Sequence, residues 1–216
     1  MHRTPIAASV LLLATAFTTV AAPSFSRAQA PEVADTSRWV INAEFSEARY
    51  LVREQLAGRD LPSDAVGRTR NVFGTLVLVD GAVVPGGSEI RVDLSAMETD
   101  SNMRDNYVRR RTLVTDSFPM ATFVPTELRG VPAPLPGSGT HTFQIAGQLT
   151  LKDVTRPVVW DAEADFTEGT VVGTARVAFP FTEFGITKPS VRRVLSVADS
   201  IRLELDYHFQ KAGGDR

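Results

Sequence analysis

Residues that could carry out chemistry are few in this chain, and they lie far apart. The 216 residues include no cysteine, which excludes thiol nucleophiles, redox pairs and thiolate metal sites. Of the three histidines, His141 and His208 are isolated and His2 lies in a leading segment, so we expect no histidine-rich zinc site. Neither a G-x-S-x-G elbow nor a glycine-rich phosphate-binding pattern occurs. The sequence therefore predicts a protein that is not an enzyme and that needs no metal or cofactor.

A row of acidic residues is one group that could act on a ligand. Asp161, Glu163 and Asp165 alternate along a predicted strand, on the face opposite Trp160. Such a row could bind a cation or serve as a general acid–base pair. The pattern is more typical of the solvated outside of a strand, where charges also discourage edge pairing. We expect this second role.

Charged residues near the middle of the chain form the other such group. On a helix, Arg104 and Asp105 would point about 100° apart, so we expect them to fix the helix to a neighbouring loop or strand across a barrel opening. Arg109, Arg110 and Arg111 would lie in the last turn, where cations suit the helix dipole. We favour a solvated helix end, and a site for an anionic headgroup is the alternative.

The elements that must position these groups are short strands with one apolar face. In residues 200–209, Ile201, Leu203 and Leu205 alternate with charged residues. Because successive strand side chains point to opposite faces, this pattern predicts one buried and one solvated face. The sequence predicts nine strands, at 38–43, 47–53, 73–79, 89–96, 120–125, 140–151, 158–166, 171–181 and 200–209.

Turn signals and one helix separate the strands. Residues 167–170 (Thr-Glu-Gly-Thr) predict a tight hairpin turn. Residues 57–70 are polar and contain two glycines and a proline, which predicts a long loop at the mouth of a barrel. Residues 100–113 break the alternation and predict a short helix, with Asp100 or Ser101 as its N-cap.

One-sided antiparallel strands predict an all-β fold, either a sandwich or a barrel. About eight strands would close a barrel that is just wide enough to be filled with side chains or to hold one ligand. Aromatic residues on the apolar faces, such as Trp160 and Phe179, would then either fill a core or line a cavity. The alternation leaves both interpretations open.

The first 30 residues differ from the rest. A basic start, Met1-His2-Arg3, precedes an apolar run from Ile6 to Ala22 and small residues up to Ala30. This pattern predicts a secretory signal that is cleaved within positions 28–30. Residues 31–216 would then form a single domain that is mildly acidic, since the chain has 23 basic and 25 acidic residues and two arginines leave with the signal. An acidic domain argues against nucleic-acid binding.

Three motifs resemble the YceI-like family. Residues 103–108 (M-R-D-N-Y-V) followed by 116–123 (D-S-F-P-M-A-T-F) resemble one family signature, and residues 145–158 (I-A-G-Q-L-T-L-K-D-V-T-R-P-V) resemble the most specific one. Residues 184–186 (F-G-I) resemble a third, and the similarity covers nearly all of residues 31–216. Three features depart from the family pattern: the long polar stretch 53–67, Asp153 at a position where glycine is common, and the arginines at 109–111.

The resemblance implies an extended, lipocalin-like antiparallel barrel of about eight or nine strands with one short helix, in a protein of the periplasm or secreted. Characterised relatives hold a polyisoprenoid chain or an isoprenoid quinone, and no catalytic residue set carries over. We therefore expect a carrier or buffer for a long apolar, isoprenoid-type lipid, with no nucleic-acid partner and no membrane span in the mature chain. The alternative is a non-enzymatic stress or interaction module with a filled barrel and no ligand. The oligomeric state stays open, with a homodimer as one option.

We predict which side chains contact the ligand from two criteria: they lie on the apolar face of an alternating strand, or they lie near the barrel mouth. We expect Tyr50, Tyr107 or Arg104 to orient the polar end of the ligand. The predicted ligand-binding residues are Tyr50, Tyr107, Phe123, Phe143, Ile145, Leu149, Trp160, Val177, Phe179, Leu203, Leu205 and Tyr207.

Overall fold

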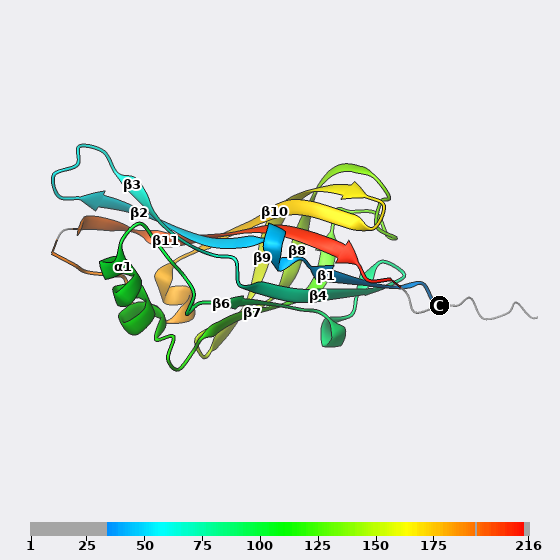
Figure 1. The fold of residues 1–216 in the computed structure, drawn as a ribbon, viewed down its shortest axis with the longest axis horizontal. Coiled ribbons are helices and arrows are strands. Elements are labelled where there is room, and N and C mark those ends of the chain that lie inside the picture. The colour runs from blue at the N-terminus through cyan, green and yellow to red at the C-terminus, as the bar shows by residue number, and fades with distance from the viewer. Residues whose placement is uncertain (1–33, 193, 214–216) are drawn as a thin grey trace, which may run out of the picture. The chain divides into compact units, whose positions relative to one another are not determined.

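A continuous antiparallel sheet contains most of the chain (Figure 1). The structure, a computed structural model, describes residues 34–192 and 194–213, and the predicted signal segment 1–30 lies outside the described residues. The strands are β1 (Thr36–Ile41), β2 (Glu47–Leu56), β3 (Ser63–Thr69), β4 (Val72–Val79), β5 (Ala82–Val83), β6 (Glu89–Asp93), β7 (Met120–Arg129), β8 (Gly139–Leu151), β9 (Val154–Thr167), β10 (Thr170–Phe179) and β11 (Val194–Lys211). The helical elements are η1 (Ala43–Phe45), η2 (Pro85–Gly87), α1 (Asn102–Tyr107), η3 (Val108–Leu113) and η4 (Phe181–Phe184).

Eight of the described strands close into a ring in the order β1-β4-β6-β7-β8-β9-β10-β11, because β1 pairs with both β4 and β11. The prediction of an antiparallel barrel of about eight or nine strands is therefore confirmed. Closure pairs the backbone groups of all eight strands and leaves no free edge in the ring. The barrel, and not a sandwich, is the arrangement that this sequence adopts.

The strand β11 extends beyond the ring and has a second partner there. Its last residues pair with β1, whereas Val194–Asp206 pairs with β2, and β2 in turn pairs with β3. Two register shifts interrupt the β11–β2 ladder, one between Val194 and Ser196 and one between Val197 and Ile201. Such irregularities bend a strand and increase its twist. As a result, β2, β3 and the first half of β11 continue the wall of the barrel past the end of the ring (Figure 1).

In β9, the alternation of apolar and polar residues in the sequence matches the alternation of buried and exposed side chains in the structure. Val158, Trp160, Ala162, Ala164 and Phe166 are all buried, and the residues between them are exposed. The acidic row at positions 161, 163 and 165 therefore lies on the outer face, as expected. The predicted hairpin turn is also confirmed, because Thr167 pairs with Thr170 and Gly169 adopts the left-handed conformation, with φ of 76°.

The prediction of a loop over residues 57–70 is wrong in its second half, since residues 63–69 form β3. The glycines and the proline suggested a loop, but Gly67 has a packing role. A Cβ atom on Gly67 would lie 2.1 Å from the ring of Tyr50, so glycine allows this ring to lie across β3. Ala65, Gly67 and Thr69 face inward. This alternation was obscured because the inward residues include a glycine and a threonine, whereas Val66, between them, is apolar and faces outward.

The predicted helix over residues 100–113 exists, but it is not uniform. It consists of a short α-helix, α1, followed by a wider π-helical turn, η3. Ser101 is the N-cap residue, although its side chain makes no capping hydrogen bond. Val114 ends the helix with a left-handed φ of 54°, and the chain then enters β7.

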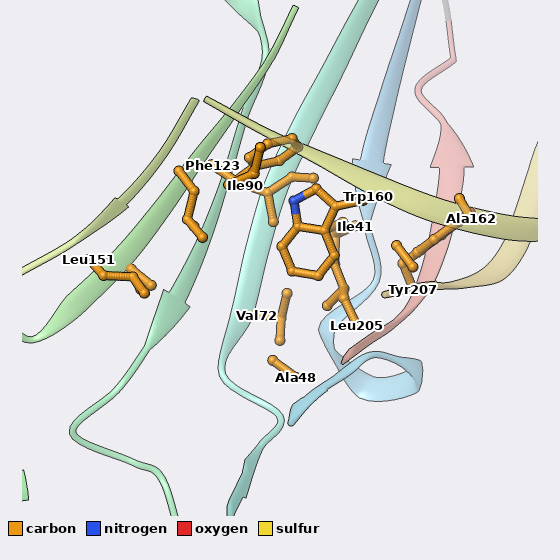
Figure 2. Close-up of a cluster of buried hydrophobic side chains, with 14 of the residues drawn as sticks. Ile41, Ala48, Val72, Ile90, Phe123, Leu151, Trp160, Ala162, Leu205 and Tyr207 are labelled. Atoms are coloured by element: carbon orange, nitrogen blue, oxygen red, sulfur yellow. The ribbon is translucent and has the colours of Figure 1, made fainter. Parts of the chain in front are cut away.

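A cluster of buried side chains fills the middle of the barrel (Figure 2). The indole of Trp160 lies at its centre, close to Ile41, Val72 and Leu205, and its ring packs edge-on against Phe123 at 5.8 Å between centroids. Val72 is completely buried. These residues form the packed core of the barrel.

Candidate functional site

The interior of the barrel contains a small void, a packed core and a large cavity in turn along its length, and the inward residues of β11 follow this order. Tyr207 and Phe209 line a small apolar void of about 40 Å³ on one side of the core. Leu205 lies in the packed core, and the inward residues of the first half of β11, including Leu203 and Ile201, line a large cavity on the other side. The strand β8 repeats the order, with Phe143 and Ile145 at the small void and Leu151 at the large cavity. The barrel is therefore filled at its middle and hollow at one end.

The large cavity has a volume of about 960 Å³. This value is near the top of the range of roughly 300–1,000 Å³ that is typical of small-molecule sites. The cavity is enclosed by β2, β3 and β11 on one side, by α1 and η3 on another, and by η4 with the segment that follows it. Most of its wall is apolar. The apolar lining residues are Val52, Leu56, Ala65, Leu94, Met97, Met103, Val108, Leu113, Leu151, Phe181, Ile186, Pro189, Val191, Val194, Val197, Ile201 and Leu203.

Four arginines and one glutamate supply the charges of the cavity wall. Arg104 donates a hydrogen bond from Nη2 to Glu54 Oε1 at 2.7 Å, and it also pairs with Asp100. Arg110, Arg111 and Arg192 are exposed and form no ion pair with any residue in 34–192 or 194–213. Since these exposed side chains line the cavity, the cavity reaches solvent at this end, and its rim is cationic.

Arg104 and Asp105 hold α1 in place, as the sequence predicts. Asp105 is buried, and its Oδ1 accepts hydrogen bonds from Thr99 N at 2.8 Å and Thr99 Oγ1 at 2.7 Å. These bonds fix the start of the helix to its own preceding loop. Arg104 ties the helix to β2 by its bond to Glu54. The partner is the carboxylate of the Glu54 side chain and not the strand backbone. Together they position α1 and η3 as one wall of the cavity.

Tyr50 is one of five neutral polar residues in this wall, and the others are Ser101, Asn106, Tyr107 and Thr112. The Tyr50 hydroxyl is buried and has no hydrogen-bond partner among the described residues. Burial raises the pKa of Tyr50 to about 12, so the hydroxyl keeps its proton near neutral pH. An unpaired buried hydroxyl is costly, and a ligand oxygen that accepts its hydrogen bond would remove that cost.

Replacing Tyr50 by phenylalanine tests this role. We expect Tyr50→Phe to lower the affinity for a prenyl lipid with an oxygen-containing headgroup about three- to tenfold, because one neutral hydrogen bond contributes about 1 kcal/mol. Affinity for squalene, a hydrocarbon without an acceptor, should not change. Titration of lipid-free protein with both ligands measures this. Equal losses for the two ligands would contradict a hydrogen-bonding role.

The structure distributes the predicted ligand-binding residues over three places. Tyr50, Tyr107 and Leu203 line the large cavity. Phe143, Ile145 and Tyr207 line the small void. The other six lie in or against the packed core, and they are Phe123, Leu149, Trp160, Val177, Phe179 and Leu205.

Several lining residues were not predicted from the sequence. Glu54 and Ala65 lie on the extension formed by β2 and β3, and Ile186 lies after η4. Val194 and Val197 precede the stretch of β11 whose alternation is regular. The inward alternation of residues 63–69 was the available signal for Ala65.

Four further residues with polar side chains lie outside the wall of the large cavity, and they are Trp160, Tyr207, His141 and His208. The Tyr207 hydroxyl and the Trp160 indole nitrogen are buried without partners among the described residues, and burial raises the pKa of Tyr207 above its usual value. His141 packs edge-on against Phe166, and His208 stacks near Phe45. Within residues 34–213, apart from the undescribed position 193, no three metal-ligating side chains gather. In the same residues, no helix has both the length and the apolar character to cross a membrane.

Comparisons with known proteins agree with this geometry. A family model for the YceI-like domain matches residues 39–209. A UPF0312 protein of Azotobacter vinelandii is 33% identical over 96 residues, which are 41% of this chain and 46% of that protein. The match thus spans less than half the length of this curated relative.

Solved structures share the fold at low sequence identity. A polyisoprenoid-binding domain from Saccharophagus degradans, implicated in plant cell wall breakdown, matches with a TM-score of 0.62 at 9% identity, over 81% of this chain and 98% of that one. BcnA of Burkholderia cenocepacia matches with 0.57 at 14%, over 80% and 99%. The YCEI protein of Campylobacter jejuni matches with 0.53 at 14%, over 75% and 91%.

Proposed function

This chain belongs to the YceI-like domain family, and from that premise we propose that it carries or buffers a long apolar lipid of the isoprenoid type. The observation that carries the proposal is the cavity of about 960 Å³ at one end of the barrel. A filled barrel, as expected for a module without a ligand, would leave no space of this size. The similarity to a domain that binds polyisoprenoids supports an isoprenoid ligand.

Burial of hydrocarbon would supply most of the affinity. Each Å² of apolar surface that leaves water contributes roughly 25 cal/mol, before the cost of ordering the chain. We place the tail against the apolar wall formed by residues such as Val52, Val197 and Leu203. The Tyr50 hydroxyl and the arginines of the rim would orient the polar end, because a few polar groups fix the orientation of a ligand in an apolar pocket.

Binding, rather than catalysis, is the proposed activity. The one carboxylate of the large-cavity wall, Glu54, is paired with Arg104, and Tyr50 keeps its proton near neutral pH because its pKa is about 12. Neither group is suited to remove a proton from a bound lipid. We also propose export to the periplasm or beyond the cell, because residues 1–30 have the pattern of a secretory signal.

Titration of lipid-free protein with prenyl alcohols of increasing chain length tests the proposal. The affinity should rise with chain length until the cavity is full, because each buried CH₂ contributes about 0.8 kcal/mol. The rise should then stop. Failure of every prenyl alcohol to bind, with the barrel intact by circular dichroism, would contradict the proposal.

The cationic rim gives a separate prediction about the headgroup. Replacing Arg110 and Arg111 by glutamine should weaken binding of a prenyl phosphate about tenfold at low salt, since two exposed charges each contribute up to about 1 kcal/mol. Binding of the matching prenyl alcohol should stay unchanged. Parallel titrations with the two ligands at low and high salt measure the effect. A rim that makes no contact with the headgroup would give the same affinity for the phosphate in both proteins.

A further inference from the structure

Exposed apolar side chains gather at the hollow end of the barrel. Among the described residues, the three most exposed large apolar side chains are Met103 at 83%, Leu61 at 77% and Leu195 at 67%. Met103 lies on α1, Leu61 in the turn between β2 and β3, and Leu195 at the start of β11. Single exposed apolar residues are ordinary on a protein surface, but three gather at one end of this barrel. Met103 also lines the large cavity, whereas Leu61 and Leu195 lie outside its wall, so the proposed ligand site does not explain them.

Contacts between the elements place these side chains in one region. Val194 and Ser196, on either side of Leu195, pair with the end of β2, whose turn carries Leu61. The ion pair between Arg104 and Glu54 ties α1 to the same strand. Figure 1 shows the β2–β3 turn, the start of β11 and α1 together at one end of the sheet.

Basic residues are concentrated in the same segments. We define the tip as residues 57–62, 102–113, 187–192 and 194–199, the segments that carry these exposed apolar side chains and the arginines of the rim. The tip contains seven basic and three acidic residues, whereas the whole chain has 23 basic and 25 acidic residues. Arg59 and Lys188 are exposed tip residues outside the cavity wall and form no ion pair with a described residue. A positive surface therefore surrounds the exposed apolar side chains.

This combination is characteristic of surfaces that bind to a bilayer containing anionic lipids. Apolar side chains enter the boundary between headgroups and acyl chains, while lysines and arginines remain among the anionic headgroups. A protein partner would be expected to bury an aromatic-rich patch, and none of the three most exposed side chains is aromatic.

We propose that the tip docks on an anionic bilayer surface and thereby places the opening of the cavity against the lipids. Leu61, Leu195 and Met103 enter the headgroup region, and Arg59, Lys188 and the arginines of the rim bind the anionic headgroups. This proposal rests on the proposed lipid-carrying function, because it provides the route by which a lipid enters the cavity without crossing water.

Sedimentation with vesicles tests the docking surface. The full mature chain is mixed with vesicles of phosphatidylcholine alone, or of equal parts phosphatidylcholine and phosphatidylglycerol, at low and high salt. We expect binding to the anionic vesicles that falls as salt rises. The double variant L61S/L195S and the double variant R59Q/K188Q should each bind about tenfold more weakly. D60N, which removes an acidic side chain of the tip, should bind more strongly.

Matched controls lie elsewhere on the barrel. F45S removes an exposed apolar side chain from η1, and R38Q/K211Q removes an exposed arginine and an exposed lysine from β1 and β11. Both controls should bind vesicles as the unchanged protein does. None of the altered residues lines the large cavity, so every variant should bind prenyl alcohol in solution normally.

The possible results separate the two proposals. Docking is overturned if the unchanged protein ignores anionic vesicles, if the controls lose as much binding as the tip variants, or if binding is the same with neutral vesicles. Normal prenyl-alcohol binding together with any of these results would leave the carrier function standing. Vesicle binding by a protein that takes up no prenyl alcohol would instead overturn the carrier function.

Discussion

Replacing Val52, Val197 and Leu203 together by tryptophan is expected to lower the affinity for prenyl lipids at least tenfold and to leave the fold intact. All three side chains line the large cavity and are only partly buried. Three indole rings would occupy space that the lipid tail needs. A loss of only about 60 Å² of apolar contact would account for a tenfold change, at roughly 25 cal/mol per Å².

Stability is the point on which this triple variant differs from an ordinary core substitution. Enlarging a side chain in a packed core costs about 1–3 kcal/mol, because neighbours must move. Here the added rings enter a cavity, so the free energy of unfolding should stay within about 1 kcal/mol of the unchanged protein. Urea denaturation measures the stability, and lipid titration measures the affinity.

The matched control places the same rings on the outside of the barrel. Val40, Val159 and Val172 are exposed valines on β1, β9 and β10, and their replacement by tryptophan should leave lipid affinity unchanged. If the cavity variant binds lipid as well as this control does, the lipid does not occupy the cavity.

Replacing Arg104 by methionine is expected to lower the free energy of unfolding by about 3 kcal/mol. The side chain of Glu54 is 8% exposed and that of Arg104 is 22% exposed, so the change would leave a buried carboxylate without its partner. Removal of one partner of a buried ion pair typically costs about 3–5 kcal/mol. The lower end applies because Arg104 retains some contact with water, and its second pair, with the exposed Asp100, contributes little.

A double variant separates the cost of the orphaned charge from the contribution of the pair itself. Replacing Glu54 by leucine and Arg104 by methionine removes both charges and should recover most of the lost stability, because an apolar pair can substitute for a buried ion pair. Urea denaturation of the two single variants and the double variant measures this. A double variant as unstable as Arg104→Met would show that the carboxylate is not the source of the loss.

Alternation along strands predicted the barrel well where burial is strictly one-sided. In β9, inward apolar and outward acidic residues follow each other without a break, so both the strand and the exposure of Asp161 could be predicted. In β11, the alternation was recognised only from residue 200, because the register shifts between Val194 and Ile201 interrupt the period. The start of β11, which lines the cavity, was missed for this reason.

Alternation identifies the inward face but not the depth along the barrel axis. Trp160 and Leu203 both point inward, yet one fills the core and the other lines the cavity. The difference depends on which strands meet at each level, and this depends on register across the ring. Strand β3 was obscured by its own composition, since Gly67, which suggested a loop, accommodates the ring of Tyr50.

The central claim is that a lipid occupies the large cavity, and native mass spectrometry of the purified mature protein tests it most directly. The measurement is made on the unchanged protein, the triple-tryptophan cavity variant and the outward control, followed by lipid extraction. We predict one prenyl lipid bound per chain in the unchanged protein and the control, and none in the cavity variant. An unchanged protein that carries no lipid, and that takes up none when prenyl lipids are added, would contradict the claim.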